Sequence, residues 1–310
     1  MKTTLHTLTL LAGIVMNQTL IAVMIAEESF LIDANNYAAG ATIDGVSPDG
    51  TAPFEGIDAW TASGSLSSSV NFITPSGSLS YSSGSNTLST SGGHLDTFRT
   101  NTSTPANKSI TRTDSSPITS STWTEVYFAM VVNADNATIA GNDYFAFNWD
   151  HQVVGGTRMF GFTLDGATGK QILATQGTLI NEENRNGTAT GLTLAAGNNL
   201  LVFRVTDKTS GGSDQFEMWL NPTLSATPGA ADYSVTISNG LVVGNTSYGF
   251  EGIKIEQTLS EDSILVDEFR LATSWAEVVP FTAVPEPSTY ALLAGAVTLL
   301  ALVRRRQRVG

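Results

Sequence analysis

The chain has no cysteine among its 310 residues, and only 14% of its residues are charged, against about 25% in an average soluble domain. The absence of cysteine excludes disulfides, Cys-ligated zinc, iron–sulfur clusters and a thiol nucleophile. Ser, Thr, Gly and Asn take the place of the missing charged residues. These residues suit short strands joined by turns, whereas exposed helix faces use Glu, Lys and Ala.

Basic residues are also scarce, since 15 Lys and Arg stand against 28 Asp and Glu, for a net charge of −13. Five of the 15 lie at the two ends, at Lys2, Arg304, Arg305, Arg306 and Arg308. The central part is therefore more acidic than the whole and repels phosphate backbones, so we expect no nucleic-acid partner. An acidic surface tolerates neutral glycans or cations, and it also simply keeps an exported protein soluble.

The first 26 residues have the pattern of a secretory signal peptide. They carry one charge, Lys2, followed by apolar stretches at 8–16 and 20–26, and the first acidic residue is Glu27. A basic start, an apolar middle and a small residue before a polar segment are typical of such signals. We expect a signal peptide over residues 1–26 with cleavage near Ala26; an uncleaved membrane anchor is the alternative.

The other end combines a Pro-Glu-Pro sequence, an apolar segment and a basic cluster. We predict a helix over 288–303, which Ser288 can cap, with a length of about 24 Å. That is short for about 30 Å of hydrocarbon, but flanking Arg side chains can snorkel. Positive flanks stay cytoplasmic, so the tail anchors the chain in the inner membrane with its bulk outside. The residues of this candidate signal are Pro285, Glu286, Pro287, Arg304, Arg305 and Arg306.

In this order and at the extreme C-terminus, these features resemble the PEP-CTERM sorting signal of Gram-negative bacteria. The resemblance implies processing by an exosortase-like membrane transpeptidase with cleavage near Pro285–Pro287. It also implies a cell-envelope, cell-surface or matrix location linked to extracellular polysaccharide and biofilm, with only transient anchoring in the inner membrane. An ordinary C-terminal anchor is the alternative.

The middle of the chain predicts many strands and few helices. Residues 27–120 are rich in Ser, Gly and Thr and give only weak strand signals, at 29–33, 70–74 and 95–100. From residue 123 the strand signals are strong and are separated by turn residues. They lie at 123–132, 144–149, 158–164, 199–206, 215–220, 233–237, 249–256 and 263–272. We therefore predict an all-β fold, an antiparallel β-sandwich of the jelly-roll type over residues 27–280, followed by a linker and sorting tail over 281–310.

Within residues 122–280, several segments are similar to the concanavalin A-like or LamG-like jelly roll, among them LLVFRVTD, DQFEMWLNP and ILVDEFRLATSWAEVVP. The resemblance implies that 266–270 forms the last core strand and that Trp275 closes the sandwich. It implies the fold and, more weakly, a role in glycan binding.

No catalytic pattern is evident. A glycoside hydrolase of this fold needs two carboxylates about 5–9.5 Å apart, which even spacing along one strand would supply. Glu251 with Glu256, and Asp267 with Glu268, do not have that spacing, and the adjacent Asp267 and Glu268 should point to opposite faces. We expect no enzymatic activity, with a divergent glycoside hydrolase as a remaining alternative.

Two sets of residues are candidates for ligand binding. Trp149, His151 and Trp219 could stack on a sugar ring, although sandwich aromatics more often fill the core. Oxygen-bearing side chains between strands could bind Ca²⁺, or they could simply form turns. These oxygen-bearing residues are Asp135, Asn136, Asn142, Asp143 and Asp150. The sequence thus favours a non-catalytic matrix protein and leaves open a lectin-like module, with or without calcium.

Overall fold

The computed structural model is all-β in the parts it describes, apart from one short helix. It describes residues 24–30, 38–40, 61–63, 74–97, 108–118, 124–137, 144–153, 156–165, 171–178, 188–206, 214–237, 250–257 and 263–283.

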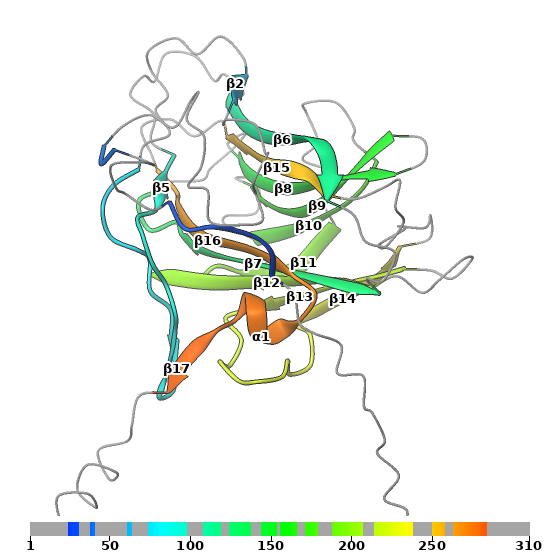
Figure 1. Cartoon of the computed structure of the whole chain (residues 1–310). Helices are drawn as coiled ribbons and strands as arrows, with labels where there is room; N and C mark the ends of the chain where they lie inside the picture. Colours follow the sequence, from blue (N-terminus) through cyan, green and yellow to red (C-terminus); the bar gives the residue numbers. More distant parts are fainter. Residues whose placement is uncertain are drawn as a thin grey trace, which may run out of the picture.

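Two antiparallel seven-stranded sheets form a sandwich (Figure 1). The first sheet has the order β1 (Met24–Glu28), β16 (Leu265–Ala272), β7 (Glu125–Asn133), β12 (Asn198–Thr206), β13 (Asp214–Leu220) and β14 (Tyr233–Ile237), and β5 (Leu95–Asp96) also pairs with β16. The second has the order β11 (Thr188–Thr193), β10 (Gln171–Thr178), β9 (Gly156–Asp165), β8 (Tyr144–Val153), β15 (Phe250–Gln257), β6 (Lys108–Ile118) and β2 (Thr61–Ser63). The prediction of an antiparallel β-sandwich is confirmed, and each of the strong strand segments predicted from residue 123 onward overlaps an observed strand.

Phenylalanines dominate the core between the two sheets. Phe203 of β12 stacks on Phe128 of β7, with ring centroids 4.7 Å apart, and also contacts Phe162 of β9 at 6.1 Å. Phe269 of β16 contacts Phe147 of β8 at 5.0 Å. These ring contacts join strands of both sheets, so aromatic packing holds the sandwich together.

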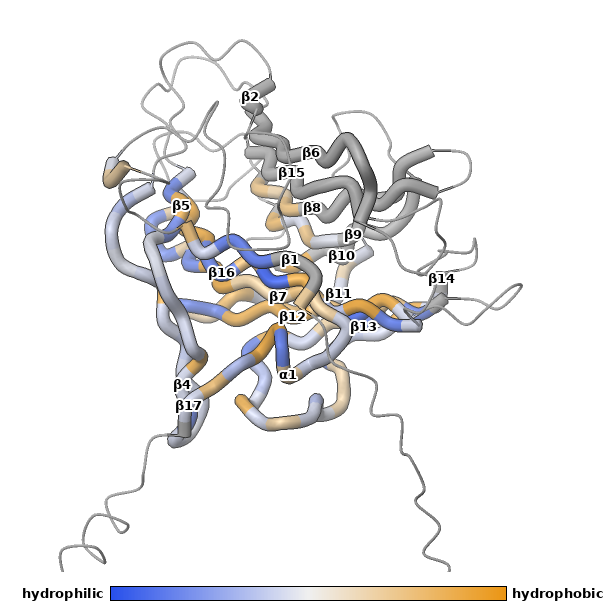
Figure 2. Tube along the Cα trace, in the orientation of Figure 1, coloured by the Kyte–Doolittle hydropathy of each residue, from blue (hydrophilic) through white to orange (hydrophobic). Residues whose placement is uncertain are grey.

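The first sheet is buried on both faces. Along β7, Phe128 and Met130 point into the core between the sheets, whereas Tyr127, Ala129 and Val131 belong to a second apolar cluster on the outer face. A strand buried on both faces needs apolar residues at every position, which explains the unbroken apolar run of β7. Figure 2, in which hydrophobic residues are orange, shows these apolar runs in the central strands of the sheet.

Three segments cover that outer face, and together we call them the cover layer: residues 79–91, 221–232 and 275–283. The first contains β3 (Ser82–Ser83) and β4 (Asn86–Leu88), and the third contains α1 (Trp275–Val278) and β17 (Phe281–Ala283). The strands form a small sheet with the order β17-β4-β3. In Figure 1 the cover layer lies below the first sheet, opposite the second sheet. Trp275 therefore packs outside the sandwich, in the second apolar cluster.

The structure places strands at both predicted domain boundaries. The predicted linker begins with a strand of the domain, since Phe281 packs against the second apolar cluster and Ala283 pairs with Asn86. At the other end, Met24 pairs with Ala272 and packs on the same cluster. Cleavage after Ala26 would therefore cut within β1. The described domain extends from residue 24 to residue 283.

Replacement of Phe203 by alanine tests the aromatic core. We expect the F203A variant to lose about 3–5 kcal/mol of unfolding free energy, because the fully buried ring leaves a cavity between the two sheets. Urea denaturation of the purified protein measures the loss. Thr193→Ala, at an exposed position of β11, is the control and should change the midpoint little. A loss below about 1 kcal/mol in F203A would contradict this account of the core.

Candidate functional site

A β-bulge in β16 gathers three buried ionisable residues, Asp267, Glu268 and Arg270, on one side of the first sheet. The pairing of β16 with β7 shifts register between Asp267 and Arg270, and Glu268 has a φ of 56°. Side chains along a regular strand alternate between the two faces of the sheet, and the extra residue of a bulge shifts this alternation by one position. Val266 and Phe269 therefore both face the core between the sheets, while Asp267 and Glu268 both face the cover layer.

The prediction that Asp267 and Glu268 point to opposite faces is consequently wrong. It assumed a regular strand, and the left-handed backbone at Glu268 breaks that regularity. No sequence signal marks this position, because left-handed residues are usually glycine or asparagine.

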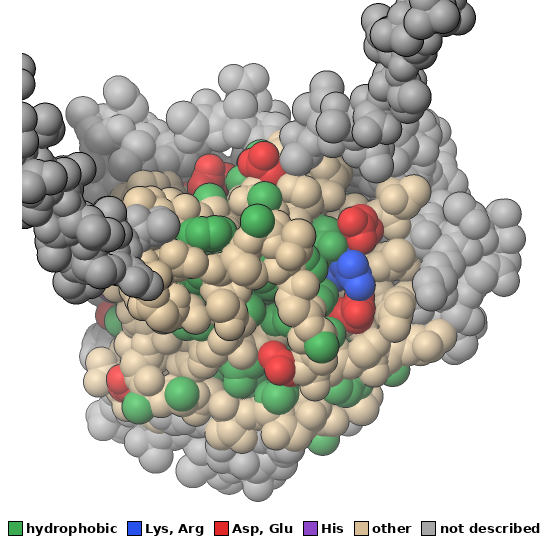
Figure 3. Space-filling model, turned by 90° about the horizontal axis from the view of Figure 1, so that it is seen from below, with side chains coloured by type: hydrophobic (Ala, Val, Ile, Leu, Met, Phe, Trp, Pro, Cys, Tyr) green, Lys and Arg blue, Asp and Glu red, His purple; other side chains and the backbone are tan. Residues whose placement is uncertain are grey.

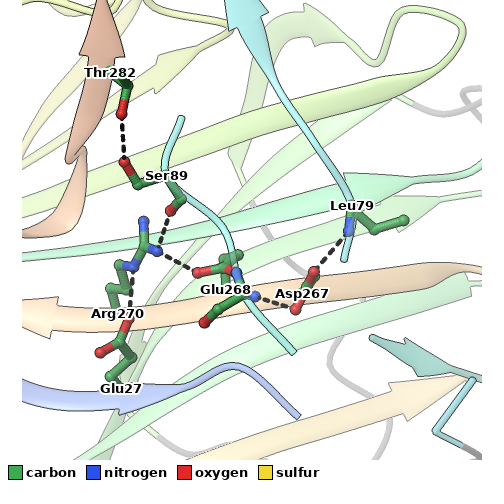
Figure 4. Close-up of polar contacts among 8 residues, drawn as sticks. Glu27, Leu79, Ser89, Asp267, Glu268, Arg270 and Thr282 are labelled. Atoms are coloured by element: carbon green, nitrogen blue, oxygen red, sulfur yellow. Dashed lines mark hydrogen bonds and ion pairs between the residues drawn. The ribbon is translucent and has the colours of Figure 1, made fainter. Parts of the chain in front are cut away.

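The bulge side chains hold the first segment of the cover layer in place (Figure 4). Asp267 accepts hydrogen bonds from the Leu79 amide through Oδ2 and from the Glu268 amide through Oδ1, both at 2.8 Å. Glu268 Oε1 accepts one from the Ser91 amide at 2.7 Å, and its Oε2 pairs with Arg270. Backbone amides at both ends of the segment thus bind buried carboxylates.

Arg270 completes this cluster. Its Nη2 donates to the Ser89 carbonyl at 2.5 Å, and its Nε donates to Glu27 Oε1 of β1 at 3.1 Å. The guanidinium therefore links β1, β16 and the cover layer. We call Asp267, Glu268, Arg270 and Glu27 the buried clamp.

Burial changes the protonation of Asp267 and Glu268. Asp267 and Glu268 are 0% and 1% exposed, and desolvation disfavours their charged forms. Burial, together with the neighbouring Glu268 charge, raises the pKa of Asp267 to about 9. Burial raises the pKa of Glu268 to about 7, although the Arg270 charge opposes the rise. With their oxygens turned to backbone amides and Arg270, these two carboxyls have no access to a substrate.

A pocket of about 450 Å³ opens elsewhere in the cover layer, within the β13–β14 connection. Hydroxyl, amide and carboxylate groups supply much of its wall. It is lined by Trp219, Leu220, Asn221, Pro222, Thr223, Ser225, Thr227, Pro228, Gly229, Ala230 and Asp232. The face that carries the cover layer is mostly uncharged, with few acidic side chains on view (Figure 3).

The pocket loop is fixed through its carbonyl groups. The Trp219 indole donates to the Gly229 carbonyl at 3.0 Å, and the Trp275 indole donates to the Ser225 carbonyl at 2.9 Å. Tyr81 donates its hydroxyl proton to the Pro222 carbonyl at 3.0 Å. Because these bonds point inward, the hydroxyls of Thr223 and Thr227 remain at the exposed surface. The loop is thus a fixed polar surface.

The predicted sugar-stacking residues do not come together. Trp219 is 3% exposed and lies in the second apolar cluster, beyond the first sheet, where its ring meets Trp275 at 5.3 Å. Trp149 and His151 lie on β8 of the other sheet, opposite Phe160 and Arg158 of β9, and their side chains are outside the described residues. Sequence reasoning missed the polar pocket residues; the length of the 221–232 connection between two strands was their one signal.

The candidate calcium ligands are only partly described. Asp135 accepts the Gly197 amide with both carboxylate oxygens, each at 2.9 Å, as a turn residue would. Asn142 and Asp143 lie outside the described residues, and only the backbone of Asp150 is described. Within the described ranges, no group of three His, Asp or Glu residues is placed to hold a metal ion.

The pH dependence of stability tests the buried clamp. Since the pKa of Asp267 rises from 3.8 to about 9 on folding, the folded state binds more protons than the unfolded state between these values. The free energy of unfolding should therefore decrease as pH rises from about 4 to 9, by more than about 1 kcal/mol. Asp267→Asn should flatten this slope, even though it loses one amide bond.

Urea denaturation at a series of pH values measures that slope. Glu277→Gln, in the first turn of α1 and half-buried, is the matched control and should retain the wild-type slope. Stability that increases with pH across this window in the wild-type protein would contradict the raised pKa values.

Comparison with known proteins identifies one motif. Residues 283–307 match the PEP-CTERM protein-sorting motif, so the predicted sorting signal is confirmed. The motif marks the chain as an exported protein that an exosortase-type membrane enzyme processes and that is sorted to the cell surface. No curated protein sequence matches the chain.

Among the described residues no helix is long and apolar enough to cross a bilayer, and the predicted helix 288–303 lies outside them.

Several solved structures are similar to this chain at low identity. The T. cruzi calreticulin globular domain is 10% identical with a TM-score of 0.45, over 83% of this chain and 90% of that chain. The endo-1,3-beta-glucanase from Streptomyces sioyaensis is 13% identical with a TM-score of 0.43, over 81% and 96%. The Emp46p carbohydrate recognition domain in its metal-free form is 10% identical with a TM-score of 0.37, over 60% and 85%. At such identities the likeness concerns the fold alone.

Proposed function

We propose that this chain is a non-catalytic surface or matrix protein that is released from its membrane anchor by an exosortase-type enzyme and then associates with extracellular polysaccharide. The observation that carries the proposal is the sorting motif at 283–307, which begins at the last residue of β17, the final strand of the described domain. The resemblance of residues 122–280 to concanavalin A-like jelly rolls supports a role beside glycans. The acidic net charge of −13 favours neutral over anionic polysaccharide.

Intact mass tests the processing step. In a host that contains an exosortase, we expect the envelope-associated product to end near Pro285–Pro287 and to lack Arg304, Arg305 and Arg306. A variant with all three residues replaced by alanine should accumulate uncleaved, because positive flanks fix the orientation of the tail. A wild-type product that still carries its Arg cluster would contradict processing and leave the tail as a plain anchor.

A lectin-like contact at the polar pocket is the form of polysaccharide association that we favour. The pocket offers the hydroxyls of Thr223 and Thr227 at an exposed surface, and the loop that carries them is fixed by the two indoles. Asp232 is also exposed there, and its Oδ2 accepts a hydrogen bond from the Leu220 amide at 2.8 Å. Hydroxyl and carboxylate groups on a rigid loop suit the hydroxyls of a neutral sugar without the need for a metal ion. The buried Trp219 ring supports the loop and does not stack on the sugar.

Co-sedimentation with insoluble neutral polysaccharide tests this contact. Thr227→Arg, which places a long side chain in the pocket mouth, should weaken binding by about tenfold or more, as the loss of a few sugar hydrogen bonds would. Thr193→Arg, at an exposed position of the other sheet, introduces the same charge and should bind like the wild-type protein. Binding that only chelation of calcium abolishes would favour a metal-dependent site elsewhere, and release of reducing sugar would reinstate the hydrolase.

A further inference from the structure

The sorting tail leaves the domain beside a tight hairpin. Ala283, the last residue of β17, pairs with Asn86 of β4, and Asn86 also pairs with Ser83 of β3. Gly84 and Ser85 form the two-residue turn between these strands, with Gly84 at a φ of 60°. Neighbouring strands lie about 4.8 Å apart, so the hairpin tip is within about 10 Å of the point where the tail departs.

The hairpin is fixed to the body of the domain. Asn86 donates its side-chain amide to the Leu224 carbonyl at 2.6 Å. At the base of the hairpin, the Leu88 amide donates to the Tyr81 carbonyl at 2.8 Å, and the Tyr81 hydroxyl reaches the Pro222 carbonyl. These bonds join the hairpin to the pocket loop, so the two move as one body.

The strand that leads into the tail is fixed as well. The Ser89 amide donates to the Pro280 carbonyl at 2.8 Å, and the Ser89 and Thr282 hydroxyls are 3.4 Å apart. Just before them, Val278 and Val279 are fully buried in the second apolar cluster. The tail therefore begins at a fixed point, with no slack ahead of Ala283.

The reach of the chain then sets where a processing enzyme must stand. An extended chain advances at most about 3.3–3.6 Å per residue, so Pro285 lies within about 7 Å of Ala283 and Pro287 within about 14 Å. An enzyme that encloses these residues in an active site surrounds them with a layer of protein that is thicker than this reach of the chain. It must therefore come against the hairpin tip while the domain is folded.

We propose that the β3–β4 hairpin tip, residues 82–86, together with β17, is a docking surface for the extracytoplasmic face of the exosortase-type enzyme. This inference rests on the proposed processing of the tail and adds a second point of recognition, outside the sorting motif. The surface presents small neutral groups, with the side chains of Ser82 and Ser85 exposed. Such a surface fits close approach by a polar, uncharged protein surface.

Charge argues against the bilayer as the occupant of this surface. Attachment to an anionic membrane needs clustered Lys or Arg. The three segments of the cover layer, 79–91, 221–232 and 275–283, contain no Lys or Arg, and their acidic residues are Asp232 and Glu277. Arg270 of β16 is buried in the clamp, and Arg204 of β12, which lies beside Trp219, is paired with Glu125 and Glu217.

The rate of tail removal tests the proposal in the full chain. In a host that contains the enzyme, pulse-chase labelling with intact mass follows the loss of the residues after 285–287. The double variant Ser82→Arg, Ser85→Arg changes a surface almost 200 residues before the motif, so the motif itself is intact. We expect its cleavage to slow by about fivefold or more. Thr193→Arg is the control, because it adds one positive charge at an exposed position of the other sheet. It should be cleaved at the wild-type rate.

A flexible insertion separates docking from folding damage. Twelve Gly and Ser residues between Ala283 and Val284 add a mean span of about 20 Å. With this spacer, the hairpin variant and its parent should be cleaved at the same rate, because the hairpin no longer meets the enzyme. A defect that persists with the spacer would indicate misfolding and overturn the proposal.

Two further results would also overturn it. Cleavage of the double variant at the wild-type rate would show that the hairpin makes no contact, and faster cleavage would indicate attraction of the new Arg side chains to the bilayer. Failure of the proposed function has a different signature, since the wild-type chain would then keep its Arg cluster whatever the hairpin sequence.

Discussion

The bulge at Asp267 and Glu268 is the constraint on which the architecture of this domain depends. In a regular strand these neighbours would face opposite sides, and one carboxyl would enter the phenylalanine core between the sheets. The extra residue instead directs both to the outer face, where each binds a backbone amide of the cover layer. The left-handed Glu268 costs on the order of 1 kcal/mol or more, which the surrounding bonds must offset.

Burial of Asp267 and Glu268 costs desolvation free energy, but their hydrogen bonds specify one position for the segment that they bind. Desolvating two carboxyls raises their pKa values, and within the described structure Arg270 Nη1 is buried without a hydrogen-bond partner. Apolar residues of similar volume would often be as stable. The clamp, however, fixes the register of a Ser-rich segment that has few apolar residues of its own. We infer that it specifies where that segment lies more than it adds to stability.

The sequence predicts the sandwich well because its central strands must be apolar. The apolar runs of β7 and β12, which the predicted segments 123–132 and 199–206 overlap, are buried on both faces of the first sheet, so they leave a strong signal even without alternation. The edge strand β11 shows only the exposed and half-buried positions of TATGLT, and its neighbour β10 reads QILATQGT; both were missed. Their pairing depends on tertiary partners, which a window of polar residues does not record.

The functional elements also differ in how far the sequence alone predicts them. The sorting motif is a linear signal over residues 283–307, so its residues can be identified one by one in the sequence. The clamp, the pocket and the hairpin are made by residues from segments as far apart as 79–91 and 266–270. The pocket and the hairpin draw on Ser, Thr, Asn, Gly and Pro, which are common turn residues throughout the chain. Only the bulge and the loop hydrogen bonds give them a role.

The cover layer lies next to both the sorting motif and the polar pocket. It seals the outer face of the first sheet, it holds the polar pocket, and its last strand carries the chain to within two residues of the Pro-Glu-Pro sequence. Met24, at the start of β1, packs on the same apolar cluster, so both ends of the described domain depart near this layer. Under the proposed function, an anchored tail holds this layer toward the membrane. In that proposal, removal of the tail precedes binding of polysaccharide at the pocket, because the pocket and the last strand belong to the same layer.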